Sequence, residues 1–365
     1  MRALARVNLA AIERNVRRLR RELDGAELIA VVKADGYGHG AAPAARAALE
    51  GGAAWLAVAT AAEATALRLA GIGGRVLVMG ALTPDDVEEA LAAGADVVAW
   101  REDMVEAIGE RGGGRVHVKL DTGMGRLGTR DAEQATRVAE LAASTAGVQL
   151  AGLMTHFATA DEPGDAFLDE QLERFRAWAL PLRERFPDAL LHAANSAALL
   201  RDRATHFDLV RAGIAIYGLD PFQQDAASQE LEPALELVSY VAEVKRCAVG
   251  ESAGYGRRFV AESDTVLATV PIGYGDGVRR ALTNNADVLI EGRRFPLAGT
   301  VSMDNVTVDL GADGGGVRRG DEVLLIGPGL PAEEMAQRLQ TINYEITCGL
   351  APRVPRRHHR DGVPA

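Results

Sequence analysis

Residues whose side chains can bind anions or carry protons follow several apolar runs of strand length in this chain. They are Lys33, Arg126, His156, Ser196 and Arg211, and each comes at or just after such a run. When parallel strands close into a barrel, their carboxyl ends meet on one face, where barrel enzymes carry their catalytic groups. The spacing therefore predicts that these residues, distant in the sequence, lie around one site.

Lys33 has the setting of a lysine that reacts with carbonyl compounds. It follows the apolar run 28–32 and precedes the glycine-rich segment ADGYGHG. Burial there would disfavour the ammonium form and lower the lysine pKa, which is what an amine that forms a Schiff base requires. A lysine at the end of a strand can also extend its charge to solvent and serve no chemistry. The residues alone leave both interpretations open.

The segments that must position these residues alternate between strand and helix patterns from residue 27 to about 220. Between the apolar runs lie stretches with helical spacing, clearest at Leu172, Phe175, Trp178 and Leu182. Eight parallel strands covered by helices predict an α/β fold with an N-terminal (β/α)8 barrel of the TIM type, and a doubly wound open sheet is the alternative. The eight predicted strands are 27–33, 55–59, 75–80, 96–100, 115–120, 149–157, 190–194 and 206–213.

After about residue 235 the pattern changes to short strands separated by Gly, Pro and Asn turns, with one short helix at 331–340. This pattern predicts a mainly β C-terminal domain. The polar stretch 220–229 marks the joint. We therefore expect a barrel domain over residues 1–230 and a β domain over residues 231–365.

Composition limits the classes of partner. The net charge of −11 and the isoelectric point near 5.3 disfavour nucleic acid. Cys247 and Cys348, the only cysteines, are too few and too far apart for a disulfide framework, and the histidines lack the spacing of metal ligands. No run approaches the ~18 apolar residues of a membrane span. We expect a cytoplasmic protein that binds no metal, nucleic acid or membrane.

The chain resembles the alanine racemase family in a series of motifs that occur in the same order over nearly its whole length. The most specific is VVKADGYGHG at 31–40, which is similar to the family's attachment site for pyridoxal 5′-phosphate (PLP). The others are KLDTGMGRLG (119–128), MTHFATAD (154–161), HAANSAA (192–198), VRAGIAIYG (210–218), SAGYGRRF (252–259), PIGYGDG (271–277), VSMDNVTVDL (301–310) and INYEITC (342–348).

The resemblance implies that the chain interconverts L- and D-alanine with two bases. Lys33 would hold PLP and act on one face of the substrate α-carbon, while Tyr255 of the partner subunit in a homodimer would act on the other face. Such a pair inverts the centre, because the proton returns from the face opposite to the one it left. A free tyrosine has a pKa near ~10 and needs help at neutral pH. The resemblance implies that His156, hydrogen-bonded toward Tyr255 and Arg211, supplies it.

The family also implies roles around the cofactor and the substrate. Arg211 would contact the pyridine nitrogen of PLP, and Arg126 with the Met303 amide would bind the substrate carboxylate. Lys119 matches a lysine that is often carbamylated, and Asp304 would support the Met303 turn. The predicted phosphate ligands are Tyr37, Ser196, Gly213, Ile214 and Tyr344, and the predicted entrance residues are Tyr274 and Asp161. The D-alanine would serve as a peptidoglycan precursor.

Three alternatives stay open at this point. A PLP-carrier protein shares the barrel and the lysine but lacks a C-terminal β domain, whereas a barrel-type amino-acid decarboxylase has both domains and a larger substrate. A racemase of serine or of broad specificity would keep the reaction and change the substrate. One departure from the family pattern is Thr300, where an arginine that pairs with the Arg126 region is common.

Overall fold

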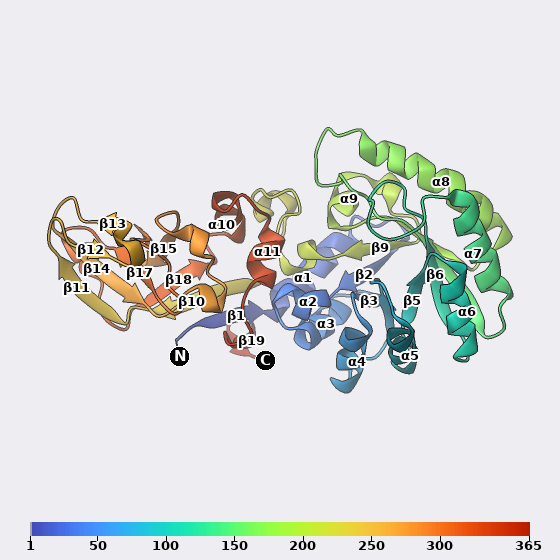
Figure 1. Cartoon of the computed structure of the whole chain (residues 1–365), viewed down its shortest axis with the longest axis horizontal. Coiled ribbons are helices and arrows are strands. Elements are labelled where there is room, and N and C mark those ends of the chain that lie inside the picture. The colour runs from blue at the N-terminus through green and yellow to red at the C-terminus, as the bar shows by residue number, and fades with distance from the viewer. Residues whose placement is uncertain (1) are drawn as a thin grey trace. The chain divides into compact units, whose positions relative to one another are not determined.

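The computed structural model describes residues 2–365, which form two compact units. The first contains Ile12–Phe222 and Ala226–Glu232, and the second contains residues 2–11, Gln223–Asp225 and Pro233–Ala365. Figure 1 labels their helices and strands. None of the helices in the described part of the chain is long and apolar enough to cross a membrane.

The first unit is a closed barrel of eight parallel strands in sequential order, which confirms the predicted fold class. The barrel closes because β2 pairs with β9 as well as with β3, which excludes the open sheet. The strands are β2 (Glu27–Val31), β3 (Trp55–Val58), β4 (Arg75–Val78), β5 (Asp96–Ala99), β6 (Gly114–Lys119), β7 (Val148–Met154), β8 (Leu190–His192) and β9 (Leu209–Ala212).

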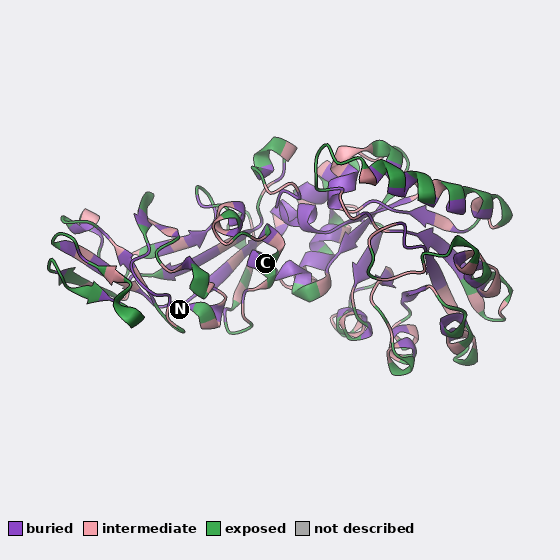
Figure 2. Cartoon of the chain, turned by 45° about the horizontal axis from the view of Figure 1, so that its top comes forward, coloured by how far each residue is buried: buried purple, intermediate pink, exposed green. Residues whose placement is uncertain are grey.

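Helices cover the outside of this barrel, so the strands are buried on both faces. Figure 2 shows buried strands and helices that expose only their outer faces. On α8 the predicted apolar stripe, Leu172, Phe175, Trp178 and Leu182, is buried. The helices are α1 (Leu9–Arg20), which enters from the preceding strand, α3 (Ala41–Glu50), α4 (Ala61–Leu69), α5 (Pro84–Ala92), α6 (Glu102–Glu110), α7 (Ala132–Ser144), α8 (Phe167–Arg185) and α9 (Ser196–Arg201). The short element α2 (Lys33–Tyr37) is a turn whose interior residues have non-helical backbones.

The second unit is mainly β, as predicted. A seven-stranded sheet has the order β16-β15-β18-β10-β1-β19-β20, and smaller sheets pair β11-β14-β17 and β12-β13. Two short helices interrupt the strands, α10 (Ala332–Arg338) and the unpredicted α11 (Asn343–Cys348). The strands are β1 (Leu4–Asn8), β10 (Leu235–Tyr240), β11 (Glu243–Cys247), β12 (Ser252–Ala253), β13 (Phe259–Val260), β14 (Thr265–Val270), β15 (Asp287–Ile290), β16 (Arg293–Pro296), β17 (Val306–Asp309), β18 (Glu322–Ile326), β19 (Arg356–Arg360) and β20 (Val363–Pro364).

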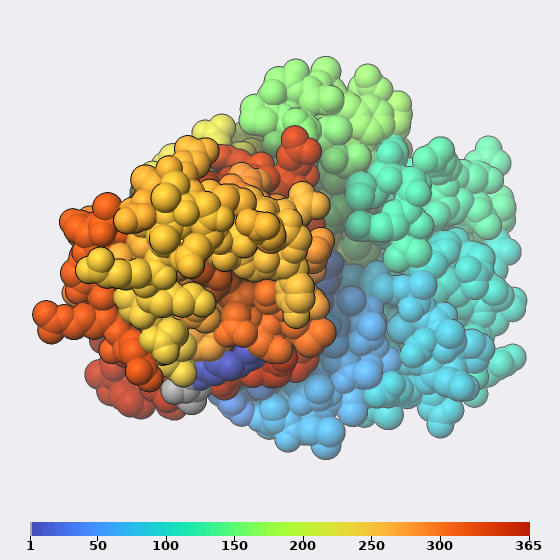
Figure 3. Space-filling model, turned by 60° about the vertical axis from the view of Figure 1, so that its left-hand side comes forward, coloured from blue at the N-terminus to red at the C-terminus, as the bar shows by residue number. Residues whose placement is uncertain are grey.

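The N-terminal strand lies in the β unit, whereas the sequence led us to expect residues 1–230 to form the barrel domain. Strand β1 pairs antiparallel with β10, where Leu4 faces Val238, and parallel with β19, where Ala5 faces Arg356. In Figure 3 the blue N-terminal segment lies among the orange and red residues of the C-terminal half. As a central strand, β1 satisfies its backbone hydrogen bonds within this sheet. Residues 2–11 therefore belong with the β unit, although the barrel follows them directly in the sequence.

Candidate active site

Lys33 lies at the carboxyl end of β2 and opens an unusual turn. Ala34 and Asp35 follow with left-handed backbones, at φ values of 52° and 53°. Such a conformation costs a residue with a Cβ roughly 1–2 kcal/mol, so surrounding contacts must hold it. The Asp35 carboxylate accepts a hydrogen bond from the Ala41 amide at 2.9 Å, and Glu63 accepts one from the Ala34 amide at 2.6 Å. These side chains fix the backbone immediately after Lys33.

Arg211 on β9 is buried and almost fully committed to protein acceptors. Its Nη1 donates to Nδ1 of His192 at 2.8 Å, and its Nη2 donates to the carbonyls of Thr155 and Ala193 at 2.8 and 2.7 Å. Nη2 also contacts Nδ1 of His156 at 3.3 Å. Its Nε is buried and has no hydrogen-bond partner among residues 2–365. Burial lowers the Arg211 pKa to about 9, so the guanidinium stays charged at neutral pH.

His156 follows β7 and lies in a strongly positive environment. Burial, together with the charges of Arg211, Lys119, Arg126 and Lys33, holds the pKa of His156 well below its ordinary value of 6.5. The ring is therefore neutral at neutral pH. These charges act on His156 because the residues lie near it at the carboxyl ends of the strands. Five predicted site residues therefore share one neighbourhood: His156, Arg211, Lys119, Arg126 and Lys33.

Lys119, the last residue of β6, is buried within this group. Burial and the nearby charges of Arg211 and Arg126 lower the Lys119 pKa from 10.5 to about 8. An appreciable fraction of its amine is thus neutral near physiological pH. Arg126 is exposed and has no hydrogen-bond or ion-pair partner within the described residues. Its guanidinium is available to a carboxylate ligand.

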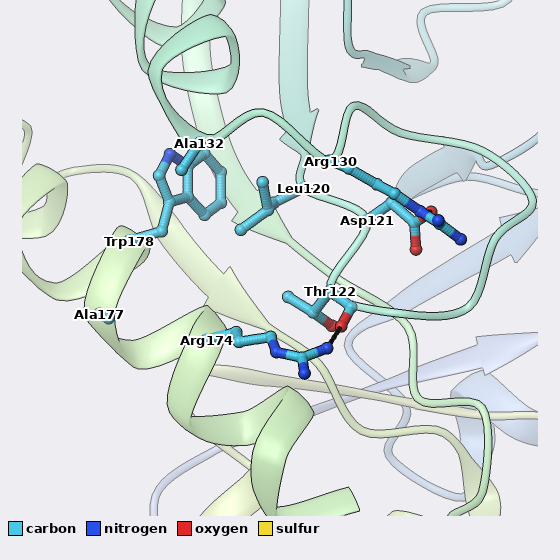
Figure 4. Close-up of a pocket in the computed structure, with 8 residues that line it drawn as sticks. All are labelled: Leu120, Asp121, Thr122, Arg130, Ala132, Arg174, Ala177 and Trp178. Carbon is cyan, nitrogen blue, oxygen red and sulfur yellow. Dashed lines mark hydrogen bonds and ion pairs between the residues drawn. The ribbon is translucent and has the colours of Figure 1, made fainter. Parts of the chain in front are cut away.

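The loop that carries Arg126 is anchored by Asp121. The Asp121 carboxylate accepts hydrogen bonds from the amides of Gly123 and Gly125 at 3.1 and 3.0 Å and from Arg130 Nε at 3.1 Å. Figure 4 shows Asp121 and Arg130 at the rim of a pocket between this loop and α8, and none of its lining residues belongs to the predicted site. The pocket is lined by Leu120, Asp121, Thr122, Arg130, Ala132, Arg174, Ala177 and Trp178.

Four of the five predicted phosphate ligands belong to the barrel unit, and three of them are in contact. The buried Ser196 hydroxyl accepts a hydrogen bond from the Gly213 amide at 2.8 Å. A Cβ on Gly213 would lie 2.5 Å from the Tyr37 hydroxyl, so only glycine allows this approach. Ile214 follows directly and begins a short 3₁₀ turn, Ile214–Tyr217.

The helix α9 is capped by Asn195. Its side chain accepts a hydrogen bond from the Ala198 amide at 2.9 Å. A serine at the start of a helix often caps it by accepting a hydrogen bond from a first-turn amide. Because Asn195 performs this role, the Ser196 hydroxyl points to the Gly213 segment instead.

The loop that contains the predicted entrance residue Asp161 is held by Arg201. The Arg201 guanidinium donates to the carbonyls of Thr159, Glu162 and Asp165 at 3.0, 2.9 and 2.8 Å. Asp161 itself is exposed. The loop keeps a defined path although it has little secondary structure.

The remaining predicted residues belong to the β unit, where three of them are unusually exposed for apolar or aromatic side chains. Tyr255 is 73% exposed, Met303 52% and Tyr274 43%. The segment 300–303 links them, because the Thr300 hydroxyl donates to the Tyr255 carbonyl at 2.6 Å and the Tyr274 amide donates to the Ser302 carbonyl at 2.9 Å. Thr300, the departure from the family pattern, thus supports the turn of Tyr255.

Arg353 connects the turns of Tyr274 and Met303. Its guanidinium binds the buried Asp276 carboxylate at 2.8 Å, and it also contacts Asp304 at 2.8 Å and the Met303 carbonyl at 3.2 Å. Asp304 is therefore part of the support of the Met303 turn. Tyr344, the last predicted ligand, lies on α11 of the same unit.

Several supporting residues were not among the sequence predictions. Arg201 and Arg353 gave no local signal, because their partners are carbonyls and carboxylates far along the chain. His117 could have been predicted to lie near the site, because it is two residues before Lys119 on β6 and side chains two residues apart lie on the same face of a strand.

The comparisons with known proteins agree over the whole chain. The family model "Alanine racemase, N-terminal domain" matches residues 7–221, and "Alanine racemase, C-terminal domain" matches residues 234–358. The alanine racemase of Symbiobacterium thermophilum is 43% identical over 362 residues, which cover 96% of each chain.

Solved structures give the same result. The alanine racemase of Streptomyces lavendulae superimposes with a TM-score of 0.92 at 39% identity, covering 98% of this chain and 97% of that one. The Bacillus anthracis alanine racemase with bound L-Ala-P has a TM-score of 0.91 at 35% identity, covering 100% and 96%.

Proposed function

The chain belongs to the alanine racemase family, and on this basis we propose that it is a PLP-dependent enzyme that interconverts L- and D-alanine through two bases, Lys33 and Tyr255. The observation that carries the proposal is the group of positive and proton-carrying side chains around His156 at the carboxyl face of the barrel. Such a group suits an anionic cofactor and the carboxylate of an amino acid.

The residues of the barrel unit fit PLP. The buried Nε–H of Arg211 lacks a partner within residues 2–365, and it can donate to the pyridine nitrogen. The bare backbone at Gly213, beside the Tyr37 hydroxyl and Ser196, suits a phosphate group. We assign the phosphate to Tyr37, Ser196, Gly213, Ile214 and Tyr344. When bound, the cofactor supplies an acceptor for the electron pair of the substrate Cα–H bond.

Lys33 and Tyr255 then divide the proton transfer. In one direction the phenolate of Tyr255 removes the α-proton and the ammonium of Lys33 returns a proton on the opposite face; the reverse direction exchanges their roles. A single base would return the proton to the face it left. The pair therefore accounts for inversion of the centre.

His156 is suited to stabilise the phenolate form of Tyr255. Arg211 can only donate hydrogen bonds, so His156 accepts from it at Nδ1 and, being neutral, carries its proton at Nε2. From that atom the ring can only donate. A hydrogen bond donated to the phenol oxygen favours its charged form.

Substrate binding is assigned to Arg126 and the Met303 amide, which would hold the carboxylate. The lowered pKa of Lys119 favours a carbamate there, because only the neutral amine reacts with carbon dioxide. A carbamate would give Arg126 an anionic partner. Tyr274 and Asp161 would narrow the entrance and favour an amino acid with a small side chain.

Tyr255 would come from the partner subunit of a homodimer. Its exposure, together with that of Tyr274 and Met303, is consistent with side chains that complete a site on another copy. The D-alanine formed would supply peptidoglycan synthesis. The β unit, with the racemase-like Tyr255 and Met303 segments, argues against the carrier alternative.

The test is to incubate the purified protein and PLP separately with L-alanine, L-serine and L-lysine and to measure the D-enantiomers by chiral chromatography. We expect D-alanine to form faster than D-serine, and no D-lysine. Release of carbon dioxide without any D-enantiomer would contradict the proposal in favour of a decarboxylase. A faster reaction with serine would change the substrate and leave the mechanism in place.

A further inference from the structure

Behind Arg211, a line of buried polar side chains crosses the interior of the barrel. Nε2 of His192 lies 2.9 Å from Nδ1 of His117, and Nε2 of His117 lies 3.2 Å from the Asp96 carboxylate. His192, His117 and Asp96 have no exposed surface. They come from β8, β6 and β5, and none of them has a role in the mechanism proposed above.

The direction of every hydrogen bond in this line follows from its first member. Arg211 can only donate, so Nδ1 of His192 accepts. A neutral His192 then carries its proton on Nε2 and donates it to Nδ1 of His117. His117 in turn carries its proton on Nε2 and donates to Asp96. A protonated ring at either position would break this order.

The surroundings keep both rings neutral. Burial lowers the pKa of His117 below its usual value, and it lowers that of His192 further, with the charge of Arg211 adding to both effects. Asp96 at the far end stays ionised, although burial opposes its charge, because His117, Arg75 and the other neighbours lower its pKa. Arg75 and Arg115 bind its two oxygens at 2.6 and 2.5 Å.

The strand geometry makes room for the line. The pairing of β6 with β7 shifts register between Val116 and His117. Opposite, a Cβ on Gly152 would lie 2.3 Å from Nδ1 of His117. Only glycine allows the ring to reach His192 there. The register shift and the glycine both accommodate the buried polar line, which indicates that the sequence specifies it.

We propose that His192, His117 and Asp96 form a positioning relay for Arg211. Nδ1 of His192, held in a fixed orientation, accepts the hydrogen bond from Nη1 of Arg211. The Nε–H of Arg211 is then left to donate to the pyridine nitrogen of the cofactor. The three residues are linked to Arg211 by hydrogen bonds and would act through it. The inference rests on the proposed function in one respect, namely that the ligand of Arg211 is PLP.

The first test measures the dissociation constant of PLP by absorbance titration of the cofactor-free protein without substrate. His117→Phe keeps a ring of similar size and removes both nitrogens. We expect it to weaken PLP binding about tenfold or more, as expected for the loss of a hydrogen bond that orients a charged group. Asp96→Asn should act in the same direction. Val118→Ala is the control, because Val118 is buried beside His117 on β6 and its side chain lies on the opposite face of the strand.

A double-mutant cycle separates positioning from a general loss of structure. In an Arg211→Lys background, His117→Phe should change the PLP dissociation constant less than about threefold, because the group through which it acts is gone. Equal losses in both backgrounds would overturn the relay. Circular dichroism and thermal midpoints of all variants identify any that fail to fold.

The second test needs no cofactor. Nitrogen-15 NMR of histidine-labelled, PLP-free protein reports the tautomer of each ring, with His117 and His192 assigned by substitution. We expect both to be neutral with the proton on Nε2. A proton on Nδ1 of His192 would overturn the relay. Failure of the wild type to bind PLP or form D-alanine would contradict the proposed function, and the tautomers would still decide the relay.

Discussion

Lys119 shows how a single buried amine can change the charge of its surroundings. Its pKa is lowered to about 8, first by burial and then by Arg211 and Arg126. A carbamate at this position would convert one of several crowded cations into an anion. The modification would be favoured, because the carbamate would give Arg126 an anionic partner and remove the repulsion between Lys119 and the neighbouring cations.

We therefore expect protein equilibrated with ¹³C-bicarbonate to show a carbamate signal in its ¹³C NMR spectrum. The signal should grow as the pH rises from 7 to 9, because the neutral fraction of Lys119 increases through its pKa. Lys119→Gln should remove it, whereas Lys245→Gln, at the edge of the β unit, should not. A spectrum without a carbamate signal at pH 9 would contradict the assignment.

The buried histidines predict how stability depends on pH. Burial lowers the pKa of His117 and His192 in the folded protein below 6.5, the value expected in the unfolded chain. Below pH 6.5 the unfolded state thus binds more protons. Stability that is complete above this pH is lost as the pH falls, by up to about 1.4 kcal/mol per pH unit for each ring. Urea denaturation between pH 7.5 and 5.0 measures it, and a midpoint that stays constant over this range would refute the prediction.

At the scale of elements, the turn after β9 must approach Tyr37 closely. Gly213→Ala would place a methyl group 2.5 Å from the Tyr37 hydroxyl. We expect this substitution to displace two assigned phosphate ligands and to weaken PLP binding by roughly tenfold or more, the cost of one lost charge-assisted hydrogen bond. Gly73→Ala is a matched control, since its Cβ would meet no atom within 4 Å. Equal PLP affinities of the two variants would exclude a phosphate role for this turn.

The same scale shows what the sequence could reveal. All eight barrel strands were predictable, because each is an apolar run bounded by turn residues. Their carboxyl ends were placed too late, however. The run 27–33 ends as a strand at Val31, because the turn that contains Ala34 and Asp35 adopts left-handed backbones. A left-handed conformation at residues other than glycine has no reliable local signal.

Long-range pairing explains the features that were missed. Strand β1 carries no mark that its partner is β10, since the pairing of Leu4 with Val238 depends on the completed sheet. The contact of His117 with His192 likewise exists only once the barrel closes. The candidate residues at the strand ends were predictable from a general rule of barrels, whereas their supports, such as Arg201 and Arg353, depend on the tertiary fold.

At the scale of the whole molecule, the proposal requires two chains for each site. If Tyr255 acts in the partner subunit, Lys33→Ala and Tyr255→Phe impair different chains of the same site. Mixing the two inactive variants under conditions that exchange subunits should form hybrid dimers with one intact site and one doubly altered site. Activity should return to about a quarter of the wild-type value from random pairing. No recovery, despite exchange shown by mixed-tag purification, would place Tyr255 in the same chain as its Lys33.

The central claim is that two bases, Lys33 and Tyr255, serve opposite faces of the substrate. It is tested most directly by following the α-hydrogen of each alanine enantiomer in D₂O by NMR and mass spectrometry, with Tyr255→Phe and the control Tyr240→Phe. We predict that Tyr255→Phe keeps PLP and exchanges the α-hydrogen of one enantiomer only, while racemisation falls by at least about 10²-fold. Undiminished racemisation of both enantiomers by Tyr255→Phe would contradict the two-base account.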